Sequence, residues 1–303
     1  MKELSLIQLY YYLCNHYNTE LHCYSQRFSP NSSPNNQKIT DEELLCIYFY
    51  CRRYENKHKK SEIYDYAIRY MQSWFPDLPN YANFNHRINT LHSAILALTA
   101  LVLQDIQDSD RIKNISADIV LVDAFPIMLC SGKRQGKVAR EIADKSYCAT
   151  KGVYYHGVKM HTVVQKVEKK LPLIDFISIT PASENDLTAF KPILPQLVNK
   201  AVFADKAYVD RPLNEQLMKG QNTFIYTPVK LTKGETEQQR QFKKAADDLF
   251  STAVSRVRQP IESLFNWINE HTGLQNASKI RATNALFVHI FGAIITVLFR
   301  YIF

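Results

Sequence analysis

The chain has 303 residues, enough for about two domains that each bury a core. Hydrophobic residues make up 46% and charged residues 22%, which excludes a wholly disordered or fibrous protein. The 37 lysines and arginines exceed the 29 acidic residues, so the net charge of +8 favours a polyanionic partner. The six cysteines show neither a Cys-x-x-Cys pair nor a zinc-binding spacing, which is typical of a reduced, cytoplasmic protein.

The first 115 residues are predicted to form a helical domain. Apolar residues recur every three or four positions from Leu6 to Leu13, and Thr40 with Glu43 forms a capping-box signature before a second helix. Further helices are expected over 61–74, near 81–88 and up to about 106. Short helices joined by tight turns predict a helix-turn-helix DNA reader, and the alternative is a bundle that only packs on the next domain.

The pattern changes to strands at about residue 116. Strands are predicted over 119–122, 152–167, 171–180, 201–204 and 223–227, and helices over 186–197, 210–219 and 236–271. Ser183 and Asp186 are interpreted as capping residues of the first of these helices. Antiparallel strands followed by strand-helix-strand units predict an α/β domain over 116–275, with a mixed β-sheet flanked by helices.

The C-terminal segment 276–303 is expected to be an apolar helix that packs on the catalytic domain. From Ala285 onward it has nineteen mostly apolar residues, close to the length that spans a bilayer. His289, Thr296 and Arg300 interrupt it at intervals that place them on one helical stripe, as in a buried helix. We therefore expect no membrane contact, the alternative being a tail anchor or interface helix. The N-terminus lacks the pattern of a signal peptide.

Two of the predicted strands run directly into an aspartate. Asp123 follows the strand 119–122, and Asp205 follows the strand 201–204. Ligands bind at the carboxyl ends of strands in open α/β sheets, and neighbouring strands lie about 4.8 Å apart. Two carboxylates so close repel each other unless a cation lies between them, and hard oxygen ligands select Mg²⁺ or Mn²⁺. The alternative for each aspartate is a simple helix N-cap.

A third acidic residue lies on the helix predicted after these strands. Glu262 stands between Ile261 and the apolar pair 264–265, on a helix that must pack against the sheet. Arg258 is four residues earlier and so lies on the same helical face. The alternative interpretation is an exposed ion pair worth less than about 0.5 kcal/mol.

These three acidic residues carry a resemblance to a known family. Asp123 in V-L-V-D-A, Asp205 in F-A-D-K-A-Y and Glu262 in R-Q-P-I-E-S-L-F-N-W resemble the DDE transposases of bacterial insertion sequences, most closely insertion-sequence family nine-eighty-two. The segments Y-H-G-V-K-M-H (155–161), T-P-A-S-E-N-D (180–186) and N-A-S-K-I-R (276–281) resemble further parts of that family in the same order. The resemblance covers residues 116–303 well and the N-terminal region only loosely.

The resemblance implies an RNase H-like fold and phosphodiester hydrolysis followed by strand transfer at the ends of a mobile element. Water attacks first and then the element's own 3′-hydroxyl, with two Mg²⁺ or Mn²⁺ ions activating the attacking oxygen and stabilising the leaving one. In the family's arrangement Asp123 bridges both ions, while Asp205 and Glu262 each hold one. A homodimer is expected because transposition joins two element ends.

Seven basic residues near these acids are expected to contact DNA: Lys133, Arg134, Lys137, Lys159, His161, Lys206 and Arg258. The first three belong to the basic segment 131–151, which follows the first catalytic strand and is expected to track a DNA backbone. Lys159 and His161 share one face of a strand, and they reach DNA if that face also carries Asp123. The alternative for each of them is a solvated surface position.

Two other functions compete with a DNA transposase. One is an RNase H-like nuclease that cuts without strand transfer. The other is a non-catalytic, domesticated DNA-binding protein that uses only its basic surface. The intact acidic triad disfavours the second, since a metal-free DNA binder has no need of clustered carboxylates.

Overall fold

The computed structural model describes residues 2–24, 38–109, 112, 115–133, 138–230, 237–278 and 280–303. The chain divides into two compact units. Unit 1 comprises Met1–Arg111 and Ile268–Phe303, and unit 2 comprises Ile112–Trp267. Each unit is described by itself.

Unit 1 is helical, as predicted for the N-terminal region. Its helices are α1 (Glu3–Thr19), η1 (Leu21–Tyr24), α2 (Asp41–Tyr54), α3 (Lys60–Tyr70), α4 (Tyr81–Thr90), α5 (His92–Asp108) and α9 (Thr283–Ile302). The predicted capping box begins α2: the Thr40 hydroxyl accepts from the Glu43 N–H, and the Glu43 carboxylate accepts from the Thr40 N–H. Buried side chains occupy almost every position from Leu44 to Arg52, so α2 is a central element of this unit.

The C-terminal helix α9 belongs to the core of unit 1. It packs against α5, α2 and α4, whereas the sequence assigned it to the catalytic domain. Its polar groups are bonded within the unit: His289 donates to the Leu274 carbonyl at 3.0 Å, and the Thr296 hydroxyl accepts from the Arg52 guanidinium at 3.1 Å. These contacts account for His289 and Thr296, two of the three residues of the polar stripe predicted from the sequence.

By length and apolar composition alone, α9 is a helix that could cross a membrane. Among the described residues, α4 and α5 meet the same two criteria only when taken together as one span bent by 55°. Most of the apolar side chains of α9 are buried in the protein, as expected for the core helix that the sequence predicted.

Unit 2 contains a mixed sheet of six strands: β1 (Ile115–Ser131), β2 (Asp144–Cys148), β3 (Val153–Val167), β4 (Leu173–Pro181), β5 (Ala201–Phe203) and β6 (Phe224–Tyr226). β1 pairs antiparallel with β3 on one side and parallel with β5 on the other. β3 pairs antiparallel with β4 and, nearer its start, with β2, while β6 lies parallel to β5. This is the mixed, RNase H-like sheet that was predicted.

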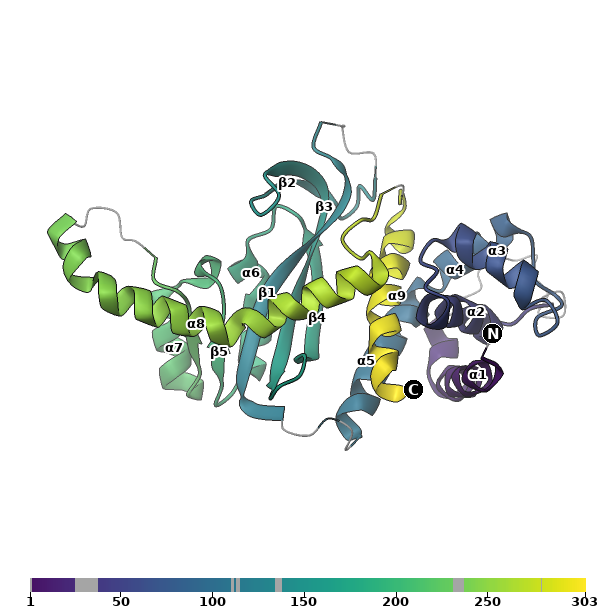
Figure 1. Cartoon of the computed structure of the whole chain (residues 1–303), viewed down its shortest axis with the longest axis horizontal. Helices are drawn as coiled ribbons and strands as arrows, with labels where there is room; N and C mark the ends of the chain where they lie inside the picture. The colour runs from purple at the N-terminus through teal and green to yellow at the C-terminus, as the bar shows by residue number, and fades with distance from the viewer. Residues whose placement is uncertain are drawn as a thin grey trace. The chain divides into compact units, whose positions relative to one another are not determined.

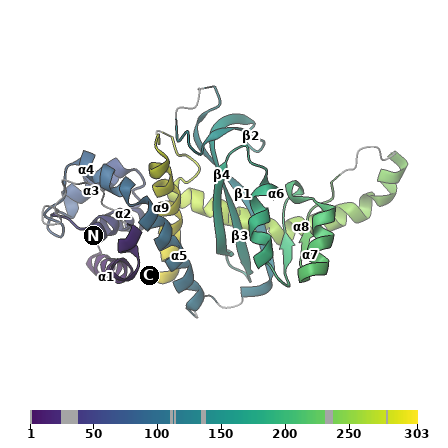
Figure 2. The same cartoon turned by 180° about the vertical axis from the view of Figure 1, so that it is seen from behind.

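Helices cover both faces of this sheet. The long helix α8 (Glu237–Thr272) crosses one face, where the rings of Phe125 and Phe265 lie 5.1 Å apart (Figure 1). The other face carries α6 (Asp186–Phe190), η3 (Lys191–Gln196) and α7 (Arg211–Gln221) (Figure 2). On that side Val120, Val122 and Val163 form a buried core with residues of η3 and α7. Alternate residues of β1 therefore face α8 and α6.

The structure corrects two predictions about local structure. The first strand continues to Ser131, so Asp123 lies inside a strand rather than at its end. Ser183 and Asp186 do not cap α6, because Asn185 does so by accepting from two backbone N–H groups. Ser183 instead donates to the carboxylate of Asp144, and β2, which contains Asp144, was not predicted at all.

Candidate active site

The pairing of β1 with β5 brings the two predicted aspartates to one level of the sheet. Ile119 pairs with Ala201, and Leu121 pairs with Phe203, in parallel register. Asp123 and Asp205 each lie two residues beyond the last of these pairs. Asp205 also N-caps the short helix η4 (Lys206–Tyr208), where its carboxylate accepts from the Lys206 N–H at 2.7 Å.

An arginine on α8 joins the first aspartate to the predicted glutamate. Arg258 Nη1 lies 3.0 Å from Asp123 Oδ2, and Arg258 Nη2 donates to Glu262 Oε1. The Arg258 side chain is 14% exposed, whereas that of Glu262 is 51% exposed. The i, i+4 pair on α8 is thus more than a surface ion pair, because its guanidinium also binds a carboxylate of the sheet.

The pKa of Asp123 departs from the ordinary value of an aspartate. Burial raises the pKa of Asp123 to about 6. The Arg258 charge and the Ala124 N–H lower this pKa, while the negative charges of Asp205 and Glu262 raise it. Asp123 therefore experiences the charges of both other acidic residues, and the site holds more negative charge than one arginine offsets.

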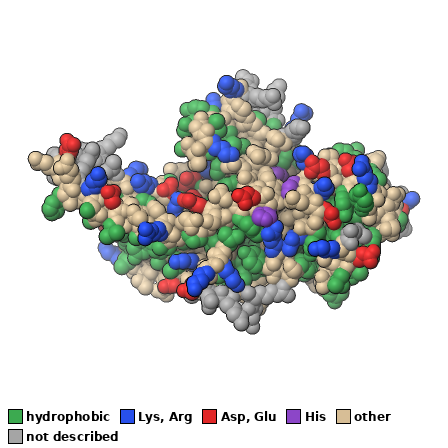
Figure 3. All heavy atoms as spheres, in the orientation of Figure 1, with side chains coloured by type: hydrophobic (Ala, Val, Ile, Leu, Met, Phe, Trp, Pro, Cys, Tyr) green, Lys and Arg blue, Asp and Glu red, His purple; other side chains and the backbone are tan. Residues whose placement is uncertain are grey.

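The kind of ligand present suits a divalent cation. Three carboxylates supply the hard oxygen atoms that Mg²⁺ and Mn²⁺ prefer. Within the described residues, no three His, Cys, Asp or Glu side chains are arranged to hold a metal ion. Arg258 bridges Asp123 and Glu262 in this arrangement. Figure 3 shows acidic and basic side chains gathered together along α8.

Two of the predicted DNA contacts lie on the opposite face of the sheet. His161 pairs with Ala124, and Lys159 pairs with Pro126, so both point away from the face of Asp123. Lys159 and His161 were expected to contact DNA only if they shared the face of Asp123, and they do not share it.

Both side chains are engaged on their own face. Lys159 binds Asp186 at 2.9 Å and the Glu184 carbonyl at 2.9 Å. His161 is buried and shares a hydrogen bond with the Thr180 hydroxyl, and burial lowers its pKa to about 4.

The remaining predicted DNA contacts fall into two groups. Lys206 lies exposed next to Asp205, and Lys133 lies exposed just after β1. Arg134 and Lys137 lie outside the described residues. Among the described members of this set, Arg258 is the one whose side chain binds two of the predicted catalytic residues.

The sequence did not single out Tyr208, which lies beside this site. Its hydroxyl is buried and has no hydrogen-bond partner among the described residues. Burial raises its pKa, and so do the charges of Asp186, Asp123 and Asp205. The feature of the sequence that could have identified Tyr208 is its position in F-A-D-K-A-Y, three residues after Asp205.

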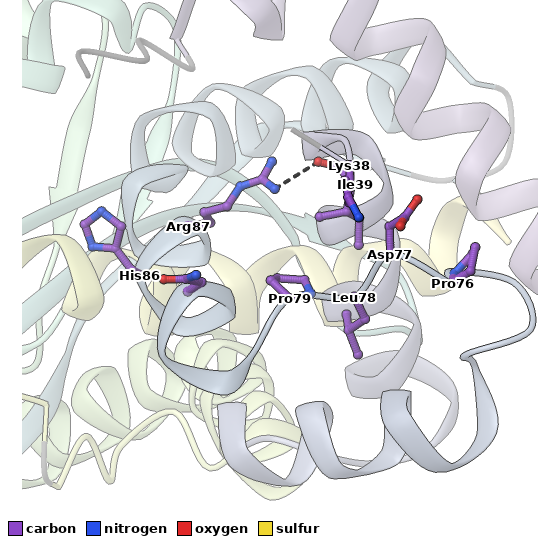
Figure 4. Close-up of a pocket in the computed structure, with 9 residues that line it drawn as sticks. Lys38, Ile39, Pro76, Asp77, Leu78, Pro79, His86 and Arg87 are labelled. Atoms are coloured by element: carbon purple, nitrogen blue, oxygen red, sulfur yellow. Dashed lines mark hydrogen bonds between the residues drawn. The ribbon is translucent and has the colours of Figure 1, made fainter. Parts of the chain in front are cut away.

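The N-terminal helices contain a separate pocket of about 560 Å³, which is lined by residues 38–39 and 76–79 and by polar side chains of α4 (Figure 4). Arg87 donates from this pocket to the Ile39 carbonyl at 2.9 Å and binds the buried Asp41 at 2.6 Å. Arg87 therefore links α4 to residues 39 and 41 within unit 1, while Asn83 and His86 line the pocket.

Comparison with known proteins agrees with this geometry. The family model for the transposase DDE domain matches residues 115–299, well over half of the chain. A search of curated proteins found no match. The matched span contains the two adjacent strands and the helix that carry the three acidic residues. The chain belongs to the family of DDE-domain transposases.

Proposed function

We propose that this protein catalyses metal-dependent phosphodiester hydrolysis and strand transfer at the ends of an insertion sequence, with Asp123, Asp205 and Glu262 as its catalytic residues. Membership of insertion-sequence family nine-eighty-two is part of the proposal. The observation that carries it is the contact of Arg258 with both Asp123 and Glu262, because it joins the helix and the sheet at the level where Asp205 leaves β5.

Each residue then has a defined task. Asp123, Asp205 and Glu262 would hold two Mg²⁺ or Mn²⁺ ions, which when bound activate the attacking oxygen and stabilise the leaving one. The Asp123 side chain is only 20% exposed, which strengthens electrostatic interactions there. Arg258 orients the carboxylates, and the exposed Lys206 binds a neighbouring phosphate.

DNA is held beyond the active site by basic residues and by unit 1. Lys133, Arg134 and Lys137 contact the backbone, which positions DNA without reading its sequence. Recognition of the element ends is assigned to the N-terminal helices as a helix-turn-helix-like domain. The protein acts as a homodimer, because two ends must be joined, and it works in the cytoplasm on the nucleoid.

The test is the replacement Asp123→Asn, which removes a negative charge while keeping the shape of the side chain. We expect Mg²⁺-dependent cleavage of element-end duplexes to fall about a hundredfold to a thousandfold, the loss that follows removal of a key electrostatic group. DNA affinity, measured by fluorescence anisotropy, stays within about twofold. Asp118→Asn is the matched control, since Asp118 is an exposed aspartate on the same strand.

Three results separate the candidate functions. Unchanged cleavage by Asp123→Asn contradicts the catalytic assignment. Cleavage by the unsubstituted protein without joining of the 3′-end to target DNA identifies a nuclease. Binding without any cleavage, at all Mg²⁺ and Mn²⁺ concentrations, identifies a non-catalytic DNA-binding protein.

A further inference from the structure

The hairpin formed by β2 and β3 has two chemically different faces. Ser146 pairs with Tyr155, and Cys148 lies in the same buried cluster as Tyr155. Tyr147 pairs with Tyr154 on the other face, which also carries Lys145 opposite His156. We call these four residues (Lys145, Tyr147, Tyr154 and His156) the hairpin face.

The two tyrosines of the hairpin face are held as an exposed pair. Their ring centroids lie 4.9 Å apart. Tyr147 is 52% exposed and Tyr154 is 61% exposed, although both belong to paired strands. Gly132 fixes the backbone beneath them: its N–H donates to the Tyr154 carbonyl at 2.8 Å, and a Cβ at Gly132 would lie 2.5 Å from the Tyr154 Cβ.

The charge of the hairpin face is positive. The ammonium of Lys145 lies 5.3 Å from the centroid of the Tyr154 ring, a cation–π distance. Lys133 is exposed just beyond Gly132. The acidic residue of β2, Asp144, points to the opposite face, where its carboxylate accepts from the Ser183 N–H at 2.8 Å. In Figure 3 basic side chains are visible at the end of the molecule formed by β2 and β3.

The hairpin face lies on the same side of the sheet as Asp123. Asp123 pairs with Thr162, and β3 has no inserted residue from Thr162 to Tyr154, whereas β1 has one extra residue between Met128 and Cys130 opposite this stretch. Even-numbered residues in this stretch therefore share the side on which Arg258 reaches Asp123. Eight residues at about 3.3 Å each separate the two points by roughly 26 Å along the strand.

We propose that the hairpin face is a stacking platform for unpaired bases of a DNA strand whose scissile phosphate lies at Asp123. Aromatic rings that stack on bases and lysines that bind the backbone are the two components of single-strand binding sites. Packing of a cross-strand aromatic pair also stabilises a hairpin, but that role does not require positive charge around the rings. The proposal rests on the proposed function, because it takes DNA as the partner.

The experiment measures binding of a fluorescein-labelled oligo(dT) strand to the full chain, with cleavage excluded by EDTA. Tyr147→Ala combined with Tyr154→Ala should weaken binding by about fivefold to a hundredfold. Tyr147→Phe combined with Tyr154→Phe should bind like the unsubstituted protein, because it keeps the rings. Phe242→Ala is the matched control, since Phe242 is an aromatic residue that is 91% exposed but lies on α8, outside the hairpin face.

A second strand separates stacking from charge. An abasic strand of equal length keeps the phosphates and lacks the bases, so the alanine pair should leave its affinity unchanged. Lys145→Gln should weaken binding of both strands and lower the salt slope by roughly 0.7, because one phosphate is no longer neutralised.

Two outcomes overturn the proposal. One is unchanged oligo(dT) binding by the variant with both tyrosines replaced by alanine. If that variant also self-associates less than the unsubstituted protein, the hairpin face is an interface between copies of the chain. The other is an equal loss of affinity for the abasic strand in a variant whose circular dichroism and melting temperature are unchanged. Neither outcome depends on Asp123, so these experiments can contradict the stacking platform without contradicting the proposed catalytic site.

Discussion

At the scale of single residues, burial decides which side chains can carry charge. Burial lowers the pKa of His289 to about 4, and the charges of Arg52, Lys60 and His58 lower it as well, while its hydrogen bond to the Leu274 carbonyl opposes them. The ring is therefore neutral in folded unit 1 near pH 6. An unfolded histidine has a pKa near 6.5, so most of it is protonated at about pH 6.

This difference predicts that unit 1 loses stability in mild acid. Between pH 6.5 and about 4 the unfolded chain binds the proton at position 289 and the folded chain does not, so the free energy of unfolding falls as pH falls. The loss is on the order of 1–3 kcal/mol, complete near pH 4 and absent above pH 7. Urea unfolding at a series of pH values measures it.

His289→Gln keeps a side-chain donor for the Leu274 carbonyl and cannot titrate, so it should reduce the pH dependence. Part of the dependence remains, because burial also lowers the pKa of His58 to about 4. A His289→Gln variant with the full pH dependence of the unsubstituted protein would exclude His289 as its source.

The residues proposed as catalytic could be singled out in the sequence, but the side chains around them could not. Asp123 and Asp205 were identifiable because each follows a short apolar run. The side of the sheet on which His161 and Lys159 lie could not be predicted. It depends on which residue of β1 each one opposes, and a shift of the register by one residue would move both side chains to the other side. Tyr208 comes to the site only through the turn that Asp205 caps.

At the scale of elements, the close approach of α9 to α2 depends on one glycine. A Cβ at Gly292 would lie 2.5 Å from the Tyr48 hydroxyl oxygen and 2.9 Å from its Cε1 atom. We expect Gly292→Ala to lower the free energy of unfolding by about 1–3 kcal/mol, as overpacking does, despite the better helix propensity of alanine. Chemical denaturation measures the change.

The double variant Gly292→Ala with Tyr48→Phe is the control for this clash. Removing the hydroxyl takes away the nearest atom, although it also removes the hydrogen bond from Tyr48 to the Val288 carbonyl. The double variant should therefore be more stable than the sum of the two single changes predicts. Simple additivity would show that Tyr48 is not the obstacle.

Elements were predictable where their pattern is local. The apolar runs of β3 and β5, the helical periodicity of α8 and the Thr40 cap of α2 all lie in contiguous residues. β2 was missed because its five residues alternate weakly and stand in a basic segment, and it becomes a strand by pairing with β3. Asn185 rather than Asp186 caps α6, because the helix begins at Asp186, whose carboxylate binds Lys159 of β3.

At the scale of the whole molecule, the excess of positive charge predicts salt-sensitive DNA binding. Lys133, Arg134 and Lys137, each replaced by Gln, should weaken duplex binding and lower the slope of log K against log salt by about 0.9 for each phosphate that is no longer neutralised. Anisotropy titrations between low and physiological salt measure the slope.

We expect the change in salt slope to depend on where the lost charges lie, and not only on their number. Replacement of Lys166, Lys170 and Lys191 by Gln removes the same total charge from other parts of unit 2 and should leave the slope nearly unchanged. Equal slopes for the two triple variants would argue against a DNA track in the segment 131–151.

The three acidic residues are supported very unequally. Asp123 stands in a strand of seventeen residues and Glu262 on a helix of thirty-six, and one guanidinium ties them together. Asp205 follows a strand of only three residues and starts a single turn of helix. A small local opening there would release one carboxylate and leave the other two in place, so amide hydrogen exchange at 203–208 would report how often the triad is complete.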